Sequence, residues 1–357
     1  MRIIQIIDSL EAGGDERMAV NYANTLVNEI EFSGIVATRK EGALLDEINE
    51  NVSYLFLNKK SKLDFGALFR LRSFIIKNKV SIVHAHSTSF FLGFLLKLIH
   101  PSLKLFWHNH HGNSQSLPKK KILILKFIAL FFNGVIAVNQ ELEVWVEQQL
   151  KAKNVIYLPN FPVKEIGMEA RTILKGKHKK RIVSLANLRS DKNHFLLLEV
   201  ARKLKLSYPD WTFHLVGKDF EDDYSKQISR LIREYDLEEN VFFYGSQQDI
   251  ENILGQASIA VLTSQFEGLP VALLEYGLYK KAVVVTNVGE IPTIVQHKFN
   301  GFIVDSNKPD LFYESLVDLI TNEELRSDFG SALYNTIQTS YTAESVIKKY
   351  LNWLQIS

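Results

Sequence analysis

Short apolar runs rich in β-branched residues recur along this chain and alternate with longer segments of helical period. The runs IIQII (3–7), IAVLT (259–263) and AVVVT (282–286) are apolar at nearly every position. A strand with one wet face alternates polar and apolar residues, so a continuous apolar run indicates burial on both faces, as in a parallel sheet. Parallel strands need long crossover connections, usually helices. The alternation therefore predicts right-handed βαβ units and an α/β fold.

The same pattern places the individual elements. The predicted strands are Arg2–Asp8, Ser33–Thr38, Val52–Leu57, Ser81–His86, Leu103–His110, Gly134–Val138, Asn154–Pro159, Arg181–Ala186, Thr212–Gly217, Asn240–Gly245, Ser258–Ser264, Ala282–Asn287 and Gly301–Asp305. The predicted helices include Asp15–Glu29, Phe65–Asn78, Asp191–Leu206, Asp222–Tyr235, Leu269–Tyr279 and Thr342–Leu354. Two doubly wound sheets of about six strands each fit this series better than one very wide sheet.

A chain of 357 residues is too long for one ordinary core, so we expect two domains. The two prolines of LPNFP (158–162) bracket a short extended piece, and the polar, Lys-rich segment KGKHKKR (175–181) leads into the next strand. These features predict a first domain over 1–162 and a second over 163–340. They leave a C-terminal helix over 341–357, which could pack on either domain and for which we favour the first.

Composition narrows the class of protein. The absence of cysteine excludes a disulfide framework and any thiolate metal site, and it suits a reducing cytoplasm. The most apolar stretch, 122–138, is interrupted by Lys126 and falls short of the roughly 20 residues that span a bilayer. It predicts a buried helix followed by a strand. Residues 52–140 contain thirteen Lys or Arg and one acid, which indicates either an anionic partner or a solvated basic face.

Polar residues follow several predicted strands, where open parallel sheets bind their ligands. In the first half, Gly13 and Gly14 open a helix, and a glycine pair there indicates an anion site or simply a tight turn. Histidines lie at two strand ends and are His84, His86, His108, His110 and His111. Residues two apart share a strand face, so the histidines should cluster. They could serve structure, acceptor binding or proton handling; a metal is disfavoured because no acid lies nearby in sequence.

In the second half, Arg189 and Lys192 lie in a turn that enters a helix. Two cations beside helix-terminal amides would bind a diphosphate. The alternative is a plain capping turn, with Ser190 or Asp191 as the N-cap and the basic residues exposed.

The segment TSQFEGLPVALLEYGLY (263–279) carries the strongest signal. A strand ends at Ser264, and the turn that follows enters a helix near Leu269 with a proline in its first turn. Glu267 and Glu275 are eight residues apart, so Glu275 lies about two turns along that helix. A helix N-terminus suits phosphate, and carboxylates accept hydrogen bonds from sugar and ribose hydroxyls. Glu275 also lies within an apolar stripe, where an unpartnered carboxylate is costly.

Taken together, these segments resemble the glycogen-synthase-like group 1 (family 4) of retaining glycosyltransferases with the GT-B fold. The likeness spans nearly the whole chain and is carried by GGDER, VSIVHAHS, HNHHG, IAVNQELE, VIYLPN, LANLRSDKN, HLVGK, VFFYGSQQDI, TSQFEGLPVALLE and VVVTNVGEIPTIVQHKFNGFIV. It departs from the family pattern at Ala186-Asn187 and at Asn160-Phe161, where the family often has glycine. The resemblance implies two Rossmann-like domains that face each other across a cleft.

The resemblance also implies roles for particular residues. Arg189 and Lys192 match the basic pair on the donor diphosphate, Glu275 the carboxylate on the nucleotide ribose, and Glu267 the carboxylate beside the donor sugar. The Gly268 and Leu269 amides lie near the sugar hydroxyls or phosphate, and Gly13 and Gly14 match the loop that closes over the donor. The histidine of the first domain falls on His110, with His108 and His111 as alternatives. The catalytic residues expected are therefore His110, Glu267, Arg189 and Lys192.

The activity expected is transfer of a hexosyl or N-acetylhexosaminyl group, with retention, from a UDP- or GDP-linked donor to a lipid-linked saccharide. The setting expected is bacterial surface polysaccharide synthesis, at the cytoplasmic side of an anionic plasma membrane, without a metal or other cofactor. One rival is a sugar-nucleotide epimerase of the same fold. Another is a non-catalytic anionic-ligand-binding protein; nucleic acid is not expected, since it leaves the glutamate pair unexplained. A dinucleotide oxidoreductase would need G-x-G-x-x-G after a strand, which Glu11–Gly14 does not supply.

Overall fold

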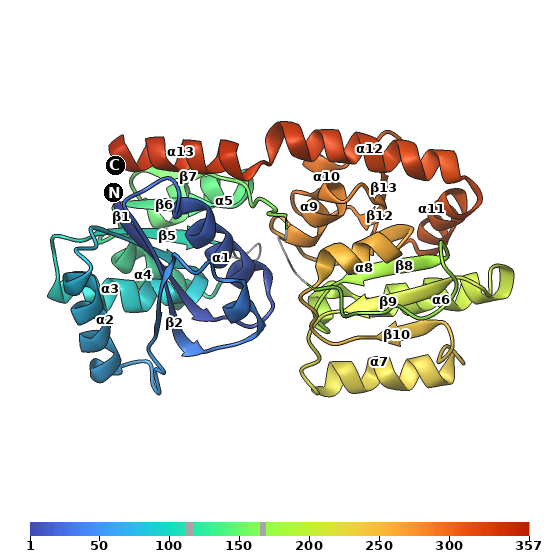
Figure 1. The fold of residues 1–357 in the computed structure, drawn as a ribbon, viewed down its shortest axis with the longest axis horizontal. Coiled ribbons are helices and arrows are strands. Elements are labelled where there is room, and N and C mark those ends of the chain that lie inside the picture. Colours follow the sequence, from blue (N-terminus) through green and yellow to red (C-terminus); the bar gives the residue numbers. More distant parts are fainter. Residues whose placement is uncertain (111–116, 165–168, 357) are drawn as a thin grey trace. The chain divides into compact units, whose positions relative to one another are not determined.

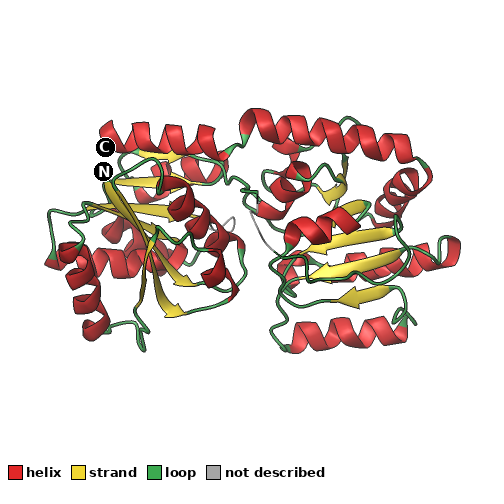
Figure 2. Ribbon diagram, in the orientation of Figure 1, coloured by secondary structure: helices red, strands yellow, loops and turns green. Residues whose placement is uncertain are grey.

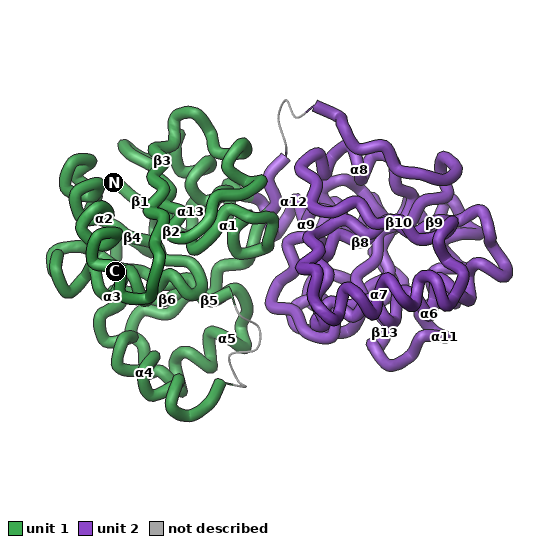
Figure 3. The backbone as a smooth tube through the Cα atoms, turned by 90° about the horizontal axis from the view of Figure 1, so that it is seen from below, with its two compact units in different colours: residues 1–161, 343–357 green, residues 162–342 purple. Residues whose placement is uncertain are grey.

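The computed structural model describes residues 1–110, 117–164 and 169–356. It divides into two compact units (Figure 3). Unit 1 contains Met1–Phe161 together with Ala343–Ser357, and unit 2 contains Pro162–Thr342. Each unit is a parallel sheet with helices on both of its faces (Figure 2). The α/β fold class with two Rossmann-like sheets is therefore confirmed.

The sheet of unit 1 has seven strands in the order β3-β2-β1-β4-β5-β6-β7 (Figure 1). All neighbouring pairs are parallel. The strands are β1 (Arg2–Ser9), β2 (Phe32–Lys40), β3 (Ser53–Phe56), β4 (Ile82–His86), β5 (Lys104–Asn109), β6 (Gly134–Ala137) and β7 (Val155–Tyr157). The strand order reverses between β1 and β4, so the carboxyl ends of these two strands form the switch point at which such sheets bind ligands.

Helices cover both faces of this sheet. Those of unit 1 are α1 (Gly14–Leu26), α2 (Phe65–Lys77), α3 (Phe90–Ile99), α4 (Lys119–Ala129), α5 (Gln140–Trp145) and α13 (Ala343–Ile356), with shorter 3-10 or π turns at Ala43–Glu47, Ser87–Ser89 and Val146–Leu150. Buried residues of α2, α3 and α4 form one core cluster with β1, β4, β5 and β6. Residues of α1 form a second cluster with β1 and β2.

The helix α13 follows unit 2 in the sequence but packs on unit 1. It lies along β6 and β7 in Figure 1 (red), and its Trp353 ring contacts Phe106 of β5 with ring centroids 5.1 Å apart. The hydroxyl of Tyr350 bonds to His84 of β4 at 3.1 Å, and both residues are fully buried. The last helix is therefore an integral part of the core of unit 1.

The sheet of unit 2 has six strands in the order β10-β9-β8-β11-β12-β13, again all parallel. They are β8 (Arg181–Leu185), β9 (Thr212–Val216), β10 (Val241–Phe243), β11 (Ile259–Leu262), β12 (Ala282–Thr286) and β13 (Phe302–Val304). The helices are α6 (His194–Ser207), α7 (Asp223–Glu234), α8 (Ile250–Gln256), α9 (Val271–Leu278), α10 (Ile291–Ile294), α11 (Pro309–Thr321) and α12 (Glu323–Ser340), with a 3-10 turn at Ser190–Lys192. The switch point lies between β8 and β11.

The predicted strands are all present, each within a few residues of its predicted bounds, because continuous apolar runs are a strong strand signal in a parallel sheet. The prediction for 122–138 is right about the helix and the strand but wrong about burial. On α4 the side chains of Leu123, Ile124 and Phe127 are 70%, 60% and 58% exposed, and only Leu125, Ile128 and Ala129 are buried. No helix of the described residues is long and apolar enough to cross a bilayer.

Candidate active site

Two loops meet at the switch point of unit 2. One follows β8 and runs through Ser190–Lys192, and the other follows β11 and runs from Thr263 to Pro270. Thr263 Oγ1 donates to Lys192 O at 2.9 Å, and Gln265 N donates to Asp191 O at 2.8 Å. Backbone contacts of this kind fix the loops against each other, so the side chains they carry are held together before any ligand binds.

Lys192 and Glu267 form an ion pair where these loops meet. The distance from Lys192 Nζ to Glu267 Oε1 is 2.7 Å, and Ser264 Oγ donates to the same carboxylate oxygen at 2.6 Å. The Glu267 side chain is 8% exposed and that of Lys192 is 22% exposed, so the pair has one accessible side. A buried carboxylate with two donors is fixed in orientation. The structure thus brings together two residues that the sequence placed in separate motifs.

Arg189 lies at the outer edge of the same loop. Its Nε bonds to Asp191 Oδ1 at 3.0 Å, while Lys192 Nζ lies 4.0 Å from Asp191 Oδ2. Neither Ser190 nor Asp191 caps the following helix, because α6 begins only at His194 and is preceded by Asn193 in the left-handed conformation. The capping alternative is therefore wrong. The Asp191 carboxylate, which that alternative expected to cap the helix, instead pairs with Arg189 and Lys192.

The turn from β11 into α9 has a different start from the one predicted. The helix begins at Val271 with Pro270 as its N-cap, so Gly268 and Leu269 precede it. The prediction of a helix from Leu269 is wrong by two residues, because proline at this point takes an extended conformation (ψ 120°). The Leu269 side chain is buried in the core. The backbone amides of Gly268 and Leu269 therefore lie in the turn before α9 and not in the first turn of the helix.

The backbone of the segment NVGEIP (287–292) packs against that turn. Gly289 has φ +52°, a conformation that favours glycine, and a Cβ there would collide with the carbonyl group of Glu267. The next residue, Glu290, donates its backbone N–H to Gly268 O at 3.0 Å. The glycine therefore permits a close approach that holds the Glu267-Gly268 backbone in place.

Glu275 is half-buried on α9 and does not lie on a fully exposed face. Burial raises the pKa of its neighbour Tyr276, and the charges of Glu275 and Glu267 raise it further. The Tyr276 hydroxyl accepts from Leu185 N at 2.7 Å and donates to Val261 O at 3.2 Å, so it joins the ends of β8 and β11. Both glutamates thus lie close to one tyrosine at the switch point of unit 2. Tyr276 was not predicted from the sequence, although an aromatic hydroxyl inside the apolar stripe VALLEYGL indicates a buried polar contact.

In unit 1, Gly13 and Gly14 occupy the turn between β1 and α1. Gly13 is the N-cap in an extended conformation, and Gly14 is the first residue of the helix. The nearest atoms to a Cβ at Gly13 would be those of the Glu16 carboxylate, a movable side chain. The acids Asp15 and Glu16 stand in the first turn. The helix start is confirmed, whereas the anion-binding role of the glycines stays a prediction.

Four of the predicted histidines form a block at the ends of β4 and β5. His84 Nε2 lies 3.1 Å from His108 Nδ1, and His86 Nδ1 lies 3.0 Å from His110 Nε2. The two hydrogen-bonded pairs stack on each other, with ring centroids 4.3 Å apart for His84 and His86 and 3.9 Å apart for His108 and His110. Clustering of the histidines is thus confirmed for these four, and His111 lies outside the described residues.

The rings of this block meet as hydrogen-bonded partners. Ring nitrogens of His84, His86 and His108 lie within 4.8 Å of one another, which is the size of a metal site. However, the planes of His84 and His108 differ by only 16°, and their facing nitrogens are 3.1 Å apart. A separation of 3.1 Å is that of an N–H···N hydrogen bond between the two rings, with one ring as donor and the other as acceptor. The geometry therefore favours neutral imidazoles that bond to one another.

Burial lowers the pKa values of His84, His86 and His108 well below the usual range, and the neighbouring histidines lower them further. These three side chains are fully buried, so the structural role left open by the sequence applies to them. His110 lies at the outer end of the block, where its Nδ1 is 4.0 Å from Asp15 Oδ1. Asp15 also accepts a hydrogen bond from Ser87 Oγ. Sequence reasoning missed Asp15, whose signal was its position directly after the glycine pair.

Two family models match the chain. Glycosyltransferase family 4 matches residues 12–161, and glycosyl transferases group 1 matches residues 168–336. The chain is 25% identical over 349 residues to an uncharacterized glycosyltransferase of Haemophilus influenzae, with 95% of both chains covered. It is 24% identical to the UDP-Gal:alpha-D-GlcNAc-diphosphoundecaprenol alpha-1,3-galactosyltransferase of Escherichia coli, covering 94% of this chain and 92% of that one.

Solved structures of the same fold agree with the topology. HepE of Anabaena, in complex with UDP and glucose, superposes with a TM-score of 0.79 over 100% of both chains at 18% identity. The two matched models lie one on each half of the chain, and both halves contain a Rossmann-like sheet with polar residues at its switch point. The chain is therefore a GT-B glycosyltransferase, with a family 4 domain in its first half and a group 1 domain in its second.

Proposed function

We propose that this glycosyltransferase moves a hexosyl or N-acetylhexosaminyl group, with retention, from a UDP- or GDP-linked donor to a lipid-linked saccharide in bacterial surface polysaccharide synthesis. The observation that carries the donor assignment is the ion pair of Lys192 and Glu267 at the switch point of unit 2. Relatives support the acceptor: the Escherichia coli protein is named for a diphosphoundecaprenol-linked sugar, and an Erwinia amylovora relative for amylovoran biosynthesis.

The chemical demand of the reaction is the negative charge that grows on the leaving diphosphate. Lys192 and Arg189 supply cations there, already oriented by Asp191 and Glu267. Preorganised charges need no rearrangement as the transition state forms, which is why they stabilise it more than water does. In the free protein two acids balance these two cations. Donor phosphate therefore competes with the carboxylates for the same ammonium and guanidinium hydrogens.

Glu267 is assigned to the donor sugar as a hydrogen-bond acceptor. Its Oε1 already receives hydrogen bonds from Lys192 and Ser264, which lowers its reactivity as a nucleophile and suits it to orienting hydroxyls. Retention then proceeds by same-face attack of the acceptor hydroxyl, without a covalent enzyme intermediate. The half-buried Glu275 is assigned to the ribose hydroxyls. In unit 1, the loop Gly13-Gly14 and His110 are assigned to the substrates as well.

Ligand-induced stabilisation tests the donor site. A ligand that binds only the folded state raises the melting temperature, and a panel of nucleotide sugars would identify base and sugar. We expect one UDP- or GDP-sugar to stabilise the wild type and to lose most of that effect in Glu275→Ala. The control is Glu234→Ala, which removes an exposed carboxylate of α7 that pairs loosely with Arg230 at 3.9 Å. Equal stabilisation of Glu275→Ala and wild type would contradict the ribose assignment, and an isomerised donor formed without acceptor would indicate the epimerase.

Transfer is expected to need no metal ion. The adjacent acids Asp222 and Asp223 begin α7, where Asp222 caps the helix by accepting from Ser225 N at 3.0 Å. Asp191 and Glu267 already pair with basic side chains. We expect transfer rates to be unchanged after treatment with EDTA. Loss of activity that Mg²⁺ restores would contradict this.

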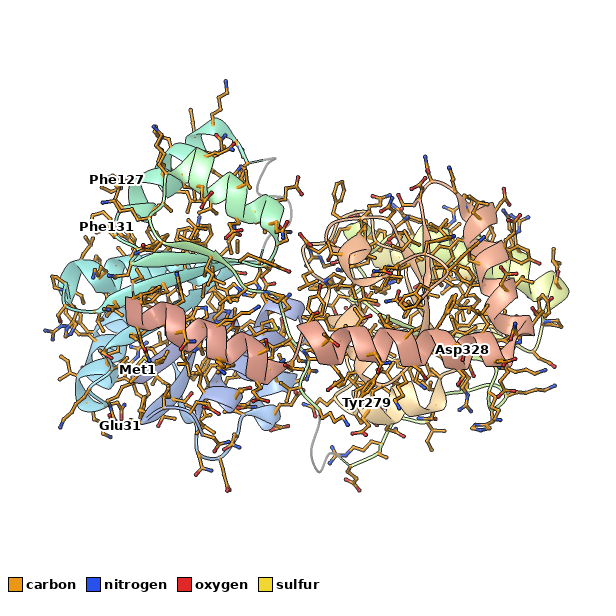
Figure 4. All side chains as sticks on the ribbon, turned by 90° about the horizontal axis from the view of Figure 1, so that it is seen from above. Met1, Glu31, Phe127, Phe131, Tyr279 and Asp328 are labelled. Carbon is orange, nitrogen blue, oxygen red and sulfur yellow. The ribbon has the colours of Figure 1, made fainter. Side chains whose placement is uncertain are left out.

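A face of unit 1 suits an anionic membrane. The exposed side chains of Leu123, Ile124 and Phe127 on α4, and of Leu130 at its C-cap, are flanked by Lys119–Lys121. Phe131 and Phe127, labelled in Figure 4, contact Phe94 of α3 with ring centroids 5.0 and 6.4 Å apart, which joins the two helices. An amphipathic helix of this kind binds anionic lipid surfaces in two ways: its apolar residues enter the bilayer interface, and its lysines are attracted to the anionic headgroups. The lipid-linked acceptor would be presented at such a surface.

Vesicle sedimentation tests this face. Equimolar phosphatidylglycerol and phosphatidylcholine vesicles should pellet the wild type, and pure phosphatidylcholine vesicles should pellet little of it. Phe127→Ser should weaken the binding by up to about 30-fold, since burying a Phe side chain is worth about 2 kcal/mol. Leu206→Ser, at a residue of unit 2 that is 85% exposed, is the matched control and should bind like wild type. Binding that ignores lipid charge would remove the membrane assignment.

A further inference from the structure

Lys59 is a buried lysine in the loop that follows β3. It is 7% exposed, whereas the next residue, Lys60, is exposed. Its backbone N–H donates to Thr38 O at 2.7 Å, which fixes it against the end of β2. Among the described residues, its ammonium group has no hydrogen-bond or ion-pair partner. Lysines are almost never buried to this extent unless they are paired, so the missing partner calls for an explanation.

The carboxylate of Asp8 acts on this ammonium but is bonded to other groups. Thr38 Oγ1 donates to one of its oxygens, and Thr88 Oγ1 donates to the other at 2.7 Å. Asp8 and Thr38 lie near the carboxyl ends of β1 and β2, and Thr88 lies just after β4, so these bonds cross the switch point. Burial lowers the pKa of Lys59, and the charge of Asp8 offsets this only in part.

The other charged groups around Lys59 leave an excess of positive charge. Arg39 of β2 lowers the pKa of Lys59 further, and its Nε lies 3.7 Å from Asp8 Oδ1, too far for a hydrogen bond. Asp64, the one acid in residues 52–140, accepts from two backbone N–H groups at 2.9 and 3.0 Å. Two cations thus stand beside a single carboxylate whose oxygens already accept other hydrogen bonds.

The ammonium of Lys59 is accessible although most of the residue is buried. Its Nζ is not among the fully buried side-chain atoms of the described residues that lack a hydrogen-bond partner, so the nitrogen itself reaches the surface. The Arg39 side chain is 39% exposed. An anion can therefore reach both cations.

These charged residues lie on the opposite face of the sheet from the histidine block. Residues two apart on a strand share a face, and Ile4 and Ile6 of β1 pack in one core cluster with α2, α3 and α4. Asp8 continues this row. Gln5 of the other row has its Oε1 2.9 Å from Nε2 of His86 in the histidine block. The two sets of polar residues are therefore separate.

The helices on that face carry the surface proposed to bind the membrane. Thr88, which bonds to Asp8, lies two residues before the start of α3, and Lys59 lies six residues before the start of α2. The helix α3 packs against the apolar and basic face of α4 through its aromatic residues. The two unpaired cations thus lie at the edge of the sheet from which the membrane-facing helices begin.

We propose that Lys59 and Arg39 bind a phosphate group of the lipid-linked acceptor. In such an acceptor phosphate joins the lipid to the saccharide, so it belongs between a membrane-binding face and a sugar site. Ammonium and guanidinium groups form charge-assisted hydrogen bonds with phosphate, and such an anion offsets the cost of burying Lys59. This deepens the proposed function and rests on it, because the acceptor is that of the proposed reaction.

Titration calorimetry of the full chain with geranyl diphosphate tests the site. The Lys192→Ala background weakens the donor site of unit 2, so that the diphosphate reports on unit 1. Geranyl diphosphate should bind, and geraniol, which lacks phosphate, should not. Lys59→Met should weaken the binding at least about tenfold, the scale of one charge-assisted hydrogen bond. The matched control is Lys62→Met, at an exposed lysine of the same loop, which should bind like the background. Equal affinities of the two methionine variants would overturn the proposal.

Melting temperatures separate binding from a structural role. Lys59→Met replaces an unpartnered, buried ammonium by an apolar side chain of similar length, so the melting temperature should stay the same or rise. A lower melting temperature with unchanged diphosphate affinity would show that Lys59 serves the fold and would overturn the proposal. If Lys59→Met does not fold, Arg39→Met gives the same binding test at the more exposed cation.

Kinetics and vesicle binding identify the source of the phosphate. With a lipid-diphosphate saccharide as acceptor, Lys59→Met should raise the acceptor KM about tenfold and leave the donor KM unchanged. It should also sediment with anionic vesicles like wild type. A raised donor KM would assign the site to the donor, and a loss of vesicle binding like that of Phe127→Ser would assign it to phospholipid headgroups; either result would overturn the proposal. A chain that transfers sugar from no donor would sink the proposed function while geranyl diphosphate binding stays measurable.

Discussion

The two units use the same topology for opposite electrostatics. Sheet order reverses between β1 and β4 in unit 1 and between β8 and β11 in unit 2, and polar residues follow these strands in both. In unit 1 the switch point contains His84, His86 and His108, which are fully buried, neutral imidazoles that bond to neighbouring rings. In unit 2 they are the charged groups of Lys192 and Glu267 with one accessible side. The topology fixes where a site lies, and the residues decide which ligand it can hold.

The two sites are also stabilised in different ways. A charge on a buried imidazole is costly, so the free energy of unfolding of unit 1 falls when pH is low enough to protonate these histidines. The ion pair of unit 2 lies partly in water, where its attraction is screened and its hydrogens remain available to phosphate.

Mild acid should destabilise unit 1 most. The pKa values of His84, His86 and His108 lie well below 6.5 in the fold, so the unfolded chain binds more protons below pH 6.5. Stability is full above pH 6.5 and is lost as pH falls toward the folded pKa values. Three such groups remove about 4 kcal/mol per pH unit. Unit 2 has two comparable histidines, His194 and His214, with pKa values of about 4 and about 3, and should lose about 3 kcal/mol.

Tryptophan fluorescence can follow unit 1 alone. Trp107, Trp145 and Trp353 belong to unit 1 and Trp211 to unit 2, so Trp211→Phe leaves reporters only in unit 1. Denaturant titrations of this variant at pH 7.0 and pH 5.5 should show a clearly lower midpoint in acid. A midpoint that does not move would contradict the neutral-imidazole description.

Lys192→Ala should reduce turnover without unfolding the chain. Loss of one preorganised charge at a developing anion typically costs about 3 kcal/mol of barrier, or two to three decades in kcat. Initial rates and a thermal melt would measure both effects. Lys177→Ala, which removes an exposed lysine paired with Asp210, is the control and should turn over like wild type. A fully active Lys192→Ala enzyme would remove the donor-diphosphate assignment.

Tyr276→Phe should destabilise unit 2 by about 2 kcal/mol. The hydroxyl joins Leu185 N to Val261 O in a fully buried position, and its removal leaves both backbone groups without this partner. Equilibrium unfolding in urea gives the change. A cost below a few tenths of a kcal/mol would mean that the strand ends are held by other contacts.

Tyr22→Phe should change stability least. Tyr22 of unit 1 is as deeply buried as Tyr276, but its hydroxyl has no hydrogen-bond partner among the described residues. Removing an unsatisfied buried hydroxyl is close to neutral, so the free energy of unfolding should change by less than about 0.5 kcal/mol. The same urea titration compares the two tyrosines. Equal costs for both would show that packing, and not the hydroxyl bonds, sets their contribution.

The sequence predicted the fold well because its signals were local and repeated. Each strand is a continuous apolar run, and parallel pairing needs helices between such runs, so two Rossmann-like sheets followed from the pattern. The sequence could not show which helix faces are exposed to solvent. The apolar residues of α4 lie on more than one face of the helix, and only the structure shows that Leu123 and Phe127 lie outside the core.

The candidate site was predicted in its residues but not in its pairings. Lys192 and Glu267 are 75 residues apart, so their ion pair depends on the two loops being adjacent in space. The left-handed Asn193 ends the 3-10 turn and moved the start of α6 beyond the predicted caps. His86 and Gln5 join His110 only through the order of β1, β4 and β5 across the sheet, which periodicity does not give.

Because α13 packs on unit 1, the fold of unit 1 can be completed only after unit 2 has been synthesised. Residues 343–356 are translated after unit 2, yet Tyr350 supplies the partner of His84 in the middle of unit 1. Domains generally begin to fold as the chain emerges from the ribosome. While unit 2 is being made, unit 1 therefore exists with a histidine nitrogen and an apolar strip of its sheet unprotected, and the arrival of the last helix completes its interior.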